Sequence, residues 1–181
     1  MTDRKLLVVC GPSGAGLGEV VSRVFALRGD AAAATPVTAR KPKAGEQDGV
    51  GFWFYDLEGW QALKDSGDLL EAMELAGNDY GTSRRRVEEQ FRAGKHVLLN
   101  LPVERAARLK ESMPEALCVY VAPSSDAILR ERFEAAGRSA LEVSVRMEQA
   151  ARQKALASFC DAVVHSDDPD AAAHALCDML P

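Results

Sequence analysis

The chain has 181 residues, of which 47% are hydrophobic, and a formal net charge of -5. This length suffices for one well-buried domain with a small inserted lobe, but not for two ordinary domains. The acidic balance gives no general attraction to nucleic acid or to anionic membranes, so we expect neither as a partner. No apolar run reaches the roughly 20 residues of a membrane helix, and Met1 to Lys5 leads into a strand without a signal-peptide core. We therefore expect a cytoplasmic protein.

The first predicted element is a buried strand from Leu6 to Val9, followed by a glycine-rich turn and an amphipathic helix. Similar apolar runs alternate with helical patterns along much of the chain, which favours a parallel sheet with helices on both faces. The strands expected in this α/β core are Leu6 to Val9, Val97 to Leu101, Leu117 to Val121, and Ala162 to His165.

The turn after the first strand has the glycine spacing of a phosphate-binding loop. It reads C-G-P-S-G-A-G-L-G-E-V from Cys10 to Val20. In the pattern G-x-x-x-x-G-K-[ST], backbone N-H groups surround phosphate oxygens, the lysine approaches the beta and gamma phosphates, and the hydroxyl binds Mg2+. Leu17 and Gly18 take the places of the lysine and the hydroxyl residue, although such a turn also occurs with no ligand. The residues expected at a phosphate are Gly11, Ser13, Gly14, Gly16, Leu17 and Gly18.

Residues 33–80 differ from the core in composition. Proline, glycine and charged clusters surround an aromatic run from Phe52 to Tyr55 and one short helical pattern from Leu57 to Lys64. We expect a small inserted lobe whose antiparallel strands form a pocket. Trp53 and Tyr55 are more typical of packing than of ligand stacking.

The second half of the chain is mainly helical between its strands. A helix is expected after a cap at Thr82 or Ser83, and another after a cap at Ser124 or Ser125. Pro102 suits the first turn of a helix that extends to Ser112. Two more helices are expected, Leu141 to Ala157 and Asp170 to Leu180. Basic residues beside the break at Gly137 are equally consistent with a lid over phosphates and with solvated helix faces.

The cysteines are scattered through the chain. They form no C-x-x-C pair, which favours reduced, buried thiols over disulfides or a metal site. They are Cys10, Cys118, Cys160 and Cys177.

Four stretches of the chain resemble guanylate kinase, the enzyme that transfers a phosphoryl group from ATP to GMP. They are G-P-S-G-A-G at 11–16, T-A-R-K-P-K-A-G-E-Q-D-G at 38–49, E-A-M-E-L-A-G-N-D-Y-G-T-S-R at 71–84, and A-G-K-H-V-L-L-N at 93–100. The second and third are the specific ones, because glycine loops occur in many families. The resemblance implies a P-loop nucleoside-monophosphate-kinase-like fold in a single domain, 1–181. Its parts would be a core of 1–32 and 81–181, a mixed α/β GMP-binding lobe of about 33–80, and a helical lid of about 130–150.

By this resemblance the inserted lobe holds GMP. Arg40 and Tyr80 match an arginine and a tyrosine on the GMP phosphate, and Lys43 stands where the family has a second arginine. Glu71 matches the carboxylate that accepts hydrogen bonds from guanine, and Thr82 matches a hydroxyl at the guanine edge.

The departures from the family pattern gather on the ATP side. Asn100 and Pro102 replace acidic residues of a D-V-Q-G-like segment, and Ala136 replaces an arginine of the lid. Arg132 and Arg146 match other lid arginines and are the catalytic residues that the resemblance implies.

Two hypotheses remain open. In the first, the protein recognises GMP, another phosphorylated small molecule, or an acidic or phosphorylated peptide, with phosphoryl transfer lost or strongly impaired. In the second, it is an active guanylate kinase, or a related phosphosugar kinase, that uses Mg2+ with ATP in a rearranged site. A lysine ammonium about 4 Å from a phosphate oxygen contributes roughly 4 kcal/mol at a dielectric near 20, or about a thousandfold in rate. The absence of that lysine favours the first hypothesis.

Overall fold

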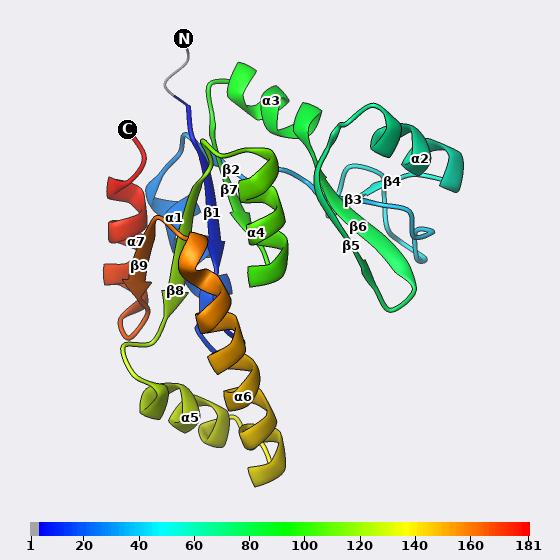
Figure 1. Ribbon diagram of the computed structural model, residues 1–181. Coiled ribbons are helices and arrows are strands. Elements are labelled where there is room, and N and C mark those ends of the chain that lie inside the picture. The colour runs from blue at the N-terminus through cyan, green and yellow to red at the C-terminus, as the bar shows by residue number, and fades with distance from the viewer. Residues whose placement is uncertain (1–3) are drawn as a thin grey trace.

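The computed structural model describes residues 4–181 and contains two sheets that lie side by side (Figure 1). The larger sheet has five strands in the order β2-β7-β1-β8-β9, and all of its pairings are parallel. Its strands are β1 (Leu6–Cys10), β2 (Ala31–Ala32), β7 (His96–Asn100), β8 (Leu117–Ala122) and β9 (Ala162–His165). Every residue of β1 is buried, as expected for the central strand of a sheet that is covered on both faces.

Helices cover both faces of this sheet, which confirms the predicted architecture. Because side chains alternate along β1, Leu7 and Val9 pack against one set of helices and Leu6 and Val8 against the other. The first set is α1 (Leu17–Leu27) and α7 (Pro169–Asp178), and the second is α3 (Arg84–Arg92) and α4 (Val103–Ser112), with the short η1 (Ala157–Phe159).

Two further helices project from the core (Figure 1). They are α5 (Asp126–Ala135) and α6 (Ala140–Leu156), which pack on each other through Leu129, Phe133 and Val143. Ser125 caps α5, and Ser139 forms a capping box with Glu142 at the start of α6. The turn at Gly137, with φ 72°, separates the two helices as predicted.

The smaller sheet has the order β4-β3-β6-β5 and is covered by α2 (Leu57–Asp65). Its strands are β3 (Val37–Thr38), β4 (Trp53–Phe54), β5 (Leu69–Leu75) and β6 (Asn78–Ser83). The prediction of antiparallel strands holds for β3-β6 and β5-β6 but is wrong for β3-β4, which is parallel. Trp53 and Tyr55 pack against the cluster around Trp60, in agreement with their expected structural role.

Several details differ from the sequence-based expectation. The two-residue strand β2 was missed, and Pro102 is the cap residue before α4 rather than part of its first turn. Cys10, Cys118 and Cys177 are buried, while Cys160 is half-buried with its Sγ 3.7 Å from that of Cys10. Within residues 4–181, no helix combines the length and apolar character that a membrane span requires. Residues 1–3, part of the N-terminal stretch expected to lack a signal peptide, lie outside the described residues.

Candidate functional site

The glycine-rich loop forms an open cradle between β1 and α1. Gly14 and Gly16 have φ values of 84° and 78°, which residues with a side chain rarely adopt. A Cβ on Gly11 would lie 2.0 Å from the carbonyl oxygen of Val121, so only glycine lets the loop lie this close to β8. Gly16 caps α1 without a side-chain hydrogen bond, which leaves the first N-H groups of the helix available to an anion.

The cradle lines a cavity of 610 Å³, whose wall consists of residues 11–19, 100–102 and Gln153. Leu17 is half-buried and packs against the core between α1 and α7. Its Cδ1 is 3.5 Å from the position of a Cβ on Gly11. Gly18 is exposed, and a Cβ built there meets nothing within 4 Å. The loop therefore provides backbone donors but no side-chain cation or hydroxyl at these two positions.

Two arginines of α5 and α6 contact this loop directly. Arg132 donates from Nη1 to the carbonyl oxygen of Gly14 at 3.2 Å and from Nη2 to that of Ser166 at 2.6 Å. Arg146 donates from Nη1 to Oγ of Ser13 at 3.0 Å. Arg138, in the turn between α5 and α6, pairs instead with Glu142 of α6 at 3.7 Å. Positive charge thus reaches the loop from α5 and α6 rather than from position 17.

A second cavity, of 480 Å³, lies between the smaller sheet and the end of β7. The pairing of β5 with β6 places Glu71 opposite Thr82 and Met73 opposite Tyr80, on one face of the hairpin. Residues that line this cavity include Pro36, Phe52, Met73, Leu75, Tyr80, Thr82, Arg105 and residues 98–101.

Glu71 lies beneath the wall of this cavity and accepts three hydrogen bonds from protein groups. Its side chain has no exposed surface, and it is not part of the cavity lining. Arg105 of α4 donates from Nε to Oε2 at 2.6 Å and from Nη2 to Oε1 at 2.5 Å, and Thr82 donates to Oε1 at 2.6 Å. The sequence analysis did not predict a role for Arg105. A sequence feature that could have indicated it is the arginine at the last position of residues 102–105, the segment that resembles D-V-Q-G.

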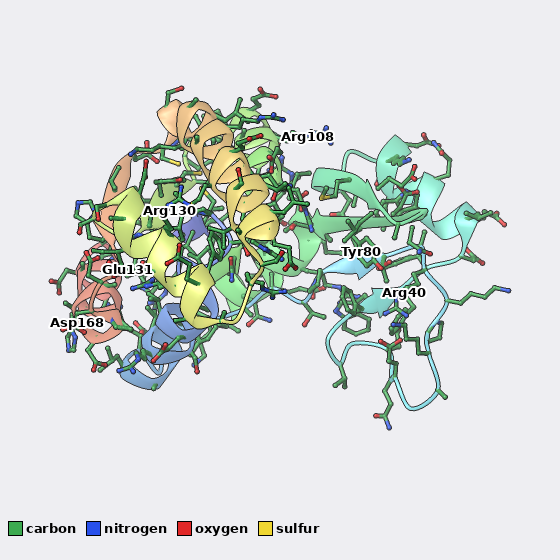
Figure 2. All side chains as sticks on the ribbon, turned by 90° about the horizontal axis from the view of Figure 1, so that it is seen from below. Arg40, Tyr80, Arg108, Arg130, Glu131 and Asp168 are labelled. Atoms are coloured by element: carbon green, nitrogen blue, oxygen red, sulfur yellow. The ribbon has the colours of Figure 1, made fainter. Side chains whose placement is uncertain are left out.

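Arg40 also has a carboxylate partner. It donates to both oxygens of Glu46, at 2.8 and 2.9 Å, and its guanidinium lies 5.4 Å from the ring centre of Phe52 and 5.3 Å from that of Phe54. The hydrogen bonds from Arg40, followed by the backbone N-H of Lys43, lower the pKa of Glu46 to about 2. Arg40 lies close to Tyr80 at the smaller sheet, away from Arg130 and Glu131 of α5 (Figure 2).

The expected GMP residues are therefore only partly gathered in one place. Tyr80 and Thr82 line the 480 Å³ cavity, whereas Arg40 lines a different, shallower surface beside Phe54. The side chain of Lys43 is exposed.

Comparison with known proteins identifies the family. The profile described as Guanylate kinase matches residues 3–181. The chain belongs to the guanylate kinase family. It is 38% identical over 169 residues to the guanylate kinase of Synechococcus sp. (strain CC9902), covering 93% of this chain and 90% of that one. The guanylate kinase of Streptomyces kasugaensis is 38% identical over 148 residues, which cover 82% of this chain and 72% of that one.

The fold agrees with this assignment. The crystal structure of guanylate kinase from Anaplasma phagocytophilum is similar with a TM-score of 0.67 and 25% identity, over 98% of this chain and 84% of that one. In this member of the guanylate kinase family, Asn100 and Leu101 line both cavities. The loop cavity and the cavity beside the smaller sheet therefore meet at the end of β7.

Proposed function

We propose that this protein performs the reaction of its family, the ATP-dependent phosphorylation of GMP, with a rearranged ATP site. The smaller sheet would serve as the GMP-binding lobe, and α5 with α6 as the lid. The observation that supports this proposal is the position of Arg132 and Arg146, whose guanidinium groups contact the glycine-rich loop. They offer the loop the positive charge that Leu17 does not provide.

Phosphoryl transfer requires alignment of the two substrates and cations close to the transferred group. In the proposed site, the backbone N-H groups of the loop and of the α1 terminus bind the ATP phosphates. Arg132 and Arg146 each use only part of their N-H donors on the protein, so further donors remain for phosphate oxygens. Tyr80 and Arg40 would bind and orient the GMP phosphate.

Mg2+ enters this reaction as part of the substrate, the Mg-ATP complex. The loop itself is poorly suited to hold the ion, because Gly18 has no hydroxyl and Ser13 Oγ already accepts from Arg146. Within residues 4–181, no group of three or more His, Cys, Asp or Glu residues is arranged for a metal ion. The protein residues therefore act on the phosphates rather than on the metal.

A second candidate function is recognition of GMP or another phosphorylated small molecule without efficient turnover. Leu17 and Gly18 favour it, since they remove a cation and a hydroxyl from an otherwise complete loop. The relatives from Synechococcus, Streptomyces and Anaplasma are named guanylate kinases, and we propose no peptide ligand.

A coupled assay of ADP release distinguishes the two candidates. We expect ADP release that depends on GMP, and a decrease in kcat of about 100-fold or more for Arg132→Ala and for Arg146→Ala, the effect of losing one donor to developing charge. The matched control is Arg130→Ala, an exposed arginine of the same helix α5, which should leave kcat unchanged. Calorimetric binding of GMP without any GMP-dependent ADP release would instead establish the second candidate.

A further inference from the structure

At the 480 Å³ cavity, the surroundings of Glu71 differ from what the family resemblance implies. Glu71 was expected to face the ligand, but Arg105 and Thr82 lie between it and the cavity. We propose that Arg105 determines the base specificity of this site. With Arg105 in place, the cavity accepts 6-oxopurine nucleoside monophosphates in general, of the IMP and XMP type, at least as well as GMP.

The carboxylate of Glu71 has little capacity left for a ligand. A carboxylate offers about four acceptor sites, and three hydrogen bonds already reach Glu71, two from Arg105 and one from Thr82. Guanine would need one acceptor for its ring N-H and another for its 2-amino group. Two hydrogen bonds to guanine added to these three would need five acceptor sites, so guanine cannot form both of its bonds to Glu71 while Arg105 and Thr82 keep theirs.

Breaking the ion pair between Arg105 and Glu71 is also energetically unfavourable. The side chain of Glu71 is fully buried, and that of Arg105 is 13% exposed. Withdrawing Arg105 would leave a buried carboxylate without its counter-charge, which is strongly destabilising. A ligand that leaves the pair intact avoids this cost.

The groups that do face the cavity suit a different hydrogen-bond pattern. Nη1 of Arg105 has no acceptor among residues 4–181, and Arg105 lines the cavity, so this nitrogen can donate to a carbonyl oxygen such as O6 of an oxopurine. The hydroxyl of Thr82 gives its hydrogen to Glu71, so its oxygen remains able to accept the ring N-H at N1.

These two groups read features that guanine, hypoxanthine and xanthine share. The purines differ at C2, where guanine carries an amino donor that would find no free carboxylate acceptor. Adenine carries an amino donor at C6, which opposes the guanidinium. The inference rests on the proposed function, because it names the base that the proposed monophosphate site accepts.

The test is calorimetric titration of the intact protein with GMP, IMP, XMP and AMP. For the wild-type protein we expect IMP and XMP to bind at least as tightly as GMP, and AMP about tenfold or more weakly. In Arg105→Ala, Glu71 becomes available, so GMP should become about tenfold tighter than IMP. The matched control is Arg108→Ala, one turn later on α4, where the arginine donates to the carbonyl of Ala72; it should keep the wild-type order.

A third variant keeps the test informative if Arg105→Ala does not fold. Arg105→Lys keeps the counter-charge of Glu71 but lacks the planar guanidinium fork, so it should give an intermediate GMP-to-IMP ratio. A wild-type protein that prefers GMP over IMP by tenfold, or an Arg105→Ala variant with an unchanged ratio, would overturn the inference alone. The predicted binding order without ADP release would overturn the phosphoryl transfer alone, and binding of no purine monophosphate by the wild-type or variant proteins would overturn both.

Discussion

Leu17 and Gly18 leave the glycine-rich loop without a side-chain cation or hydroxyl at these two positions. The side chain of Leu17 packs toward the core, and the space beside Gly18 is open. Gly14 and Gly16 adopt positive φ values that glycine tolerates without strain, and the N-terminus of α1 has no side-chain cap. The loop therefore offers backbone donors, and under the proposed function its positive charge comes from Arg132 and Arg146, which contact it.

The double substitution Leu17→Lys with Gly18→Ser should strengthen ATP binding by about tenfold or more, since each charge-assisted hydrogen bond contributes roughly 1.5 to 3 kcal/mol. Turnover should rise less than affinity, because Pro102 and Ala136 still lack the acidic and basic groups of the family and catalytic groups do not act additively. Calorimetry with Mg-ATP and the ADP-release assay measure the two effects. Gly18→Ser alone is the control for the new side chain, and unchanged ATP affinity in the double variant would contradict this account of the loop.

At the site, the sequence predicted local features better than pairings between distant segments. The glycine positions follow from backbone sterics. The family resemblance indicated Arg132 and Arg146 as lid arginines, and the structure brings both into contact with the glycine-rich loop, while their catalytic role remains a prediction. The pair of Glu71 with Arg105 joins β5 to α4, 34 residues apart in the chain, and the arginine in the D-V-Q-G-like segment does not by itself indicate this partner. The roles of the GMP residues remain predictions.

Among the elements, strands with strong local signals were predicted nearly to the residue. β1, β7, β8 and β9 are apolar runs, and their predicted ends differ from the observed ends by one residue or less. β2 and β3 were harder to predict from the sequence. Each has two residues, and such short strands form because they pair with a neighbouring strand rather than because of their own residue pattern. The parallel direction of the β3-β4 pair was missed for the same reason, because the pairing of these short strands is not visible in their own sequence.

The first residue of β7, His96, should make the stability of the core depend on pH. Its side chain is 1% exposed, and Nδ1 accepts from the backbone N-H of Lys5 at 3.2 Å. Burial lowers the pKa of His96 below its ordinary value of 6.5, although Asp30 opposes this shift and Arg4 and Arg28 add to it. The unfolded chain consequently binds a proton more readily than the folded protein does.

The stabilisation from neutral His96 is thus fully present above about pH 6.5 and is lost as the pH falls through the lower, folded-state pKa. We expect Tm to decrease between pH 7 and pH 5 in the wild-type protein, and to decrease less in His96→Gln. His174→Gln, an exposed substitution on α7, is the control and should follow the wild-type curve. Equal slopes in the wild-type protein and His96→Gln would show that His96 is not responsible.

At the scale of the whole molecule, the smaller sheet is attached to the core around the five-stranded sheet along one side. Two connections join α4 to β5 beside the Arg105 pair: Arg108 donates to the carbonyl of Ala72 at 2.8 Å, and Ser112 donates to that of Leu70. Ser83 ends β6 and caps α3, so the hairpin continues directly into the core. These contacts secure one side of the smaller sheet, whereas the guanidinium of Arg40 donates to Glu46 and to the carbonyl of Lys41, both within residues 40–46.

This asymmetry predicts a closing motion about the α4-β5 contacts when both cavities are filled. The cavities meet at Asn100, so two anionic substrates bring their phosphates together there, and the arginines on either side gain by approaching them. Small-angle X-ray scattering should show a smaller radius of gyration with GMP and a non-hydrolysable ATP analogue together, and a smaller decrease with either alone. Arg40→Ala should lose most of the decrease caused by GMP, while Arg130→Ala should retain it. Full compaction with the ATP analogue alone would contradict this mechanism, because it would show that closure does not depend on the monophosphate side.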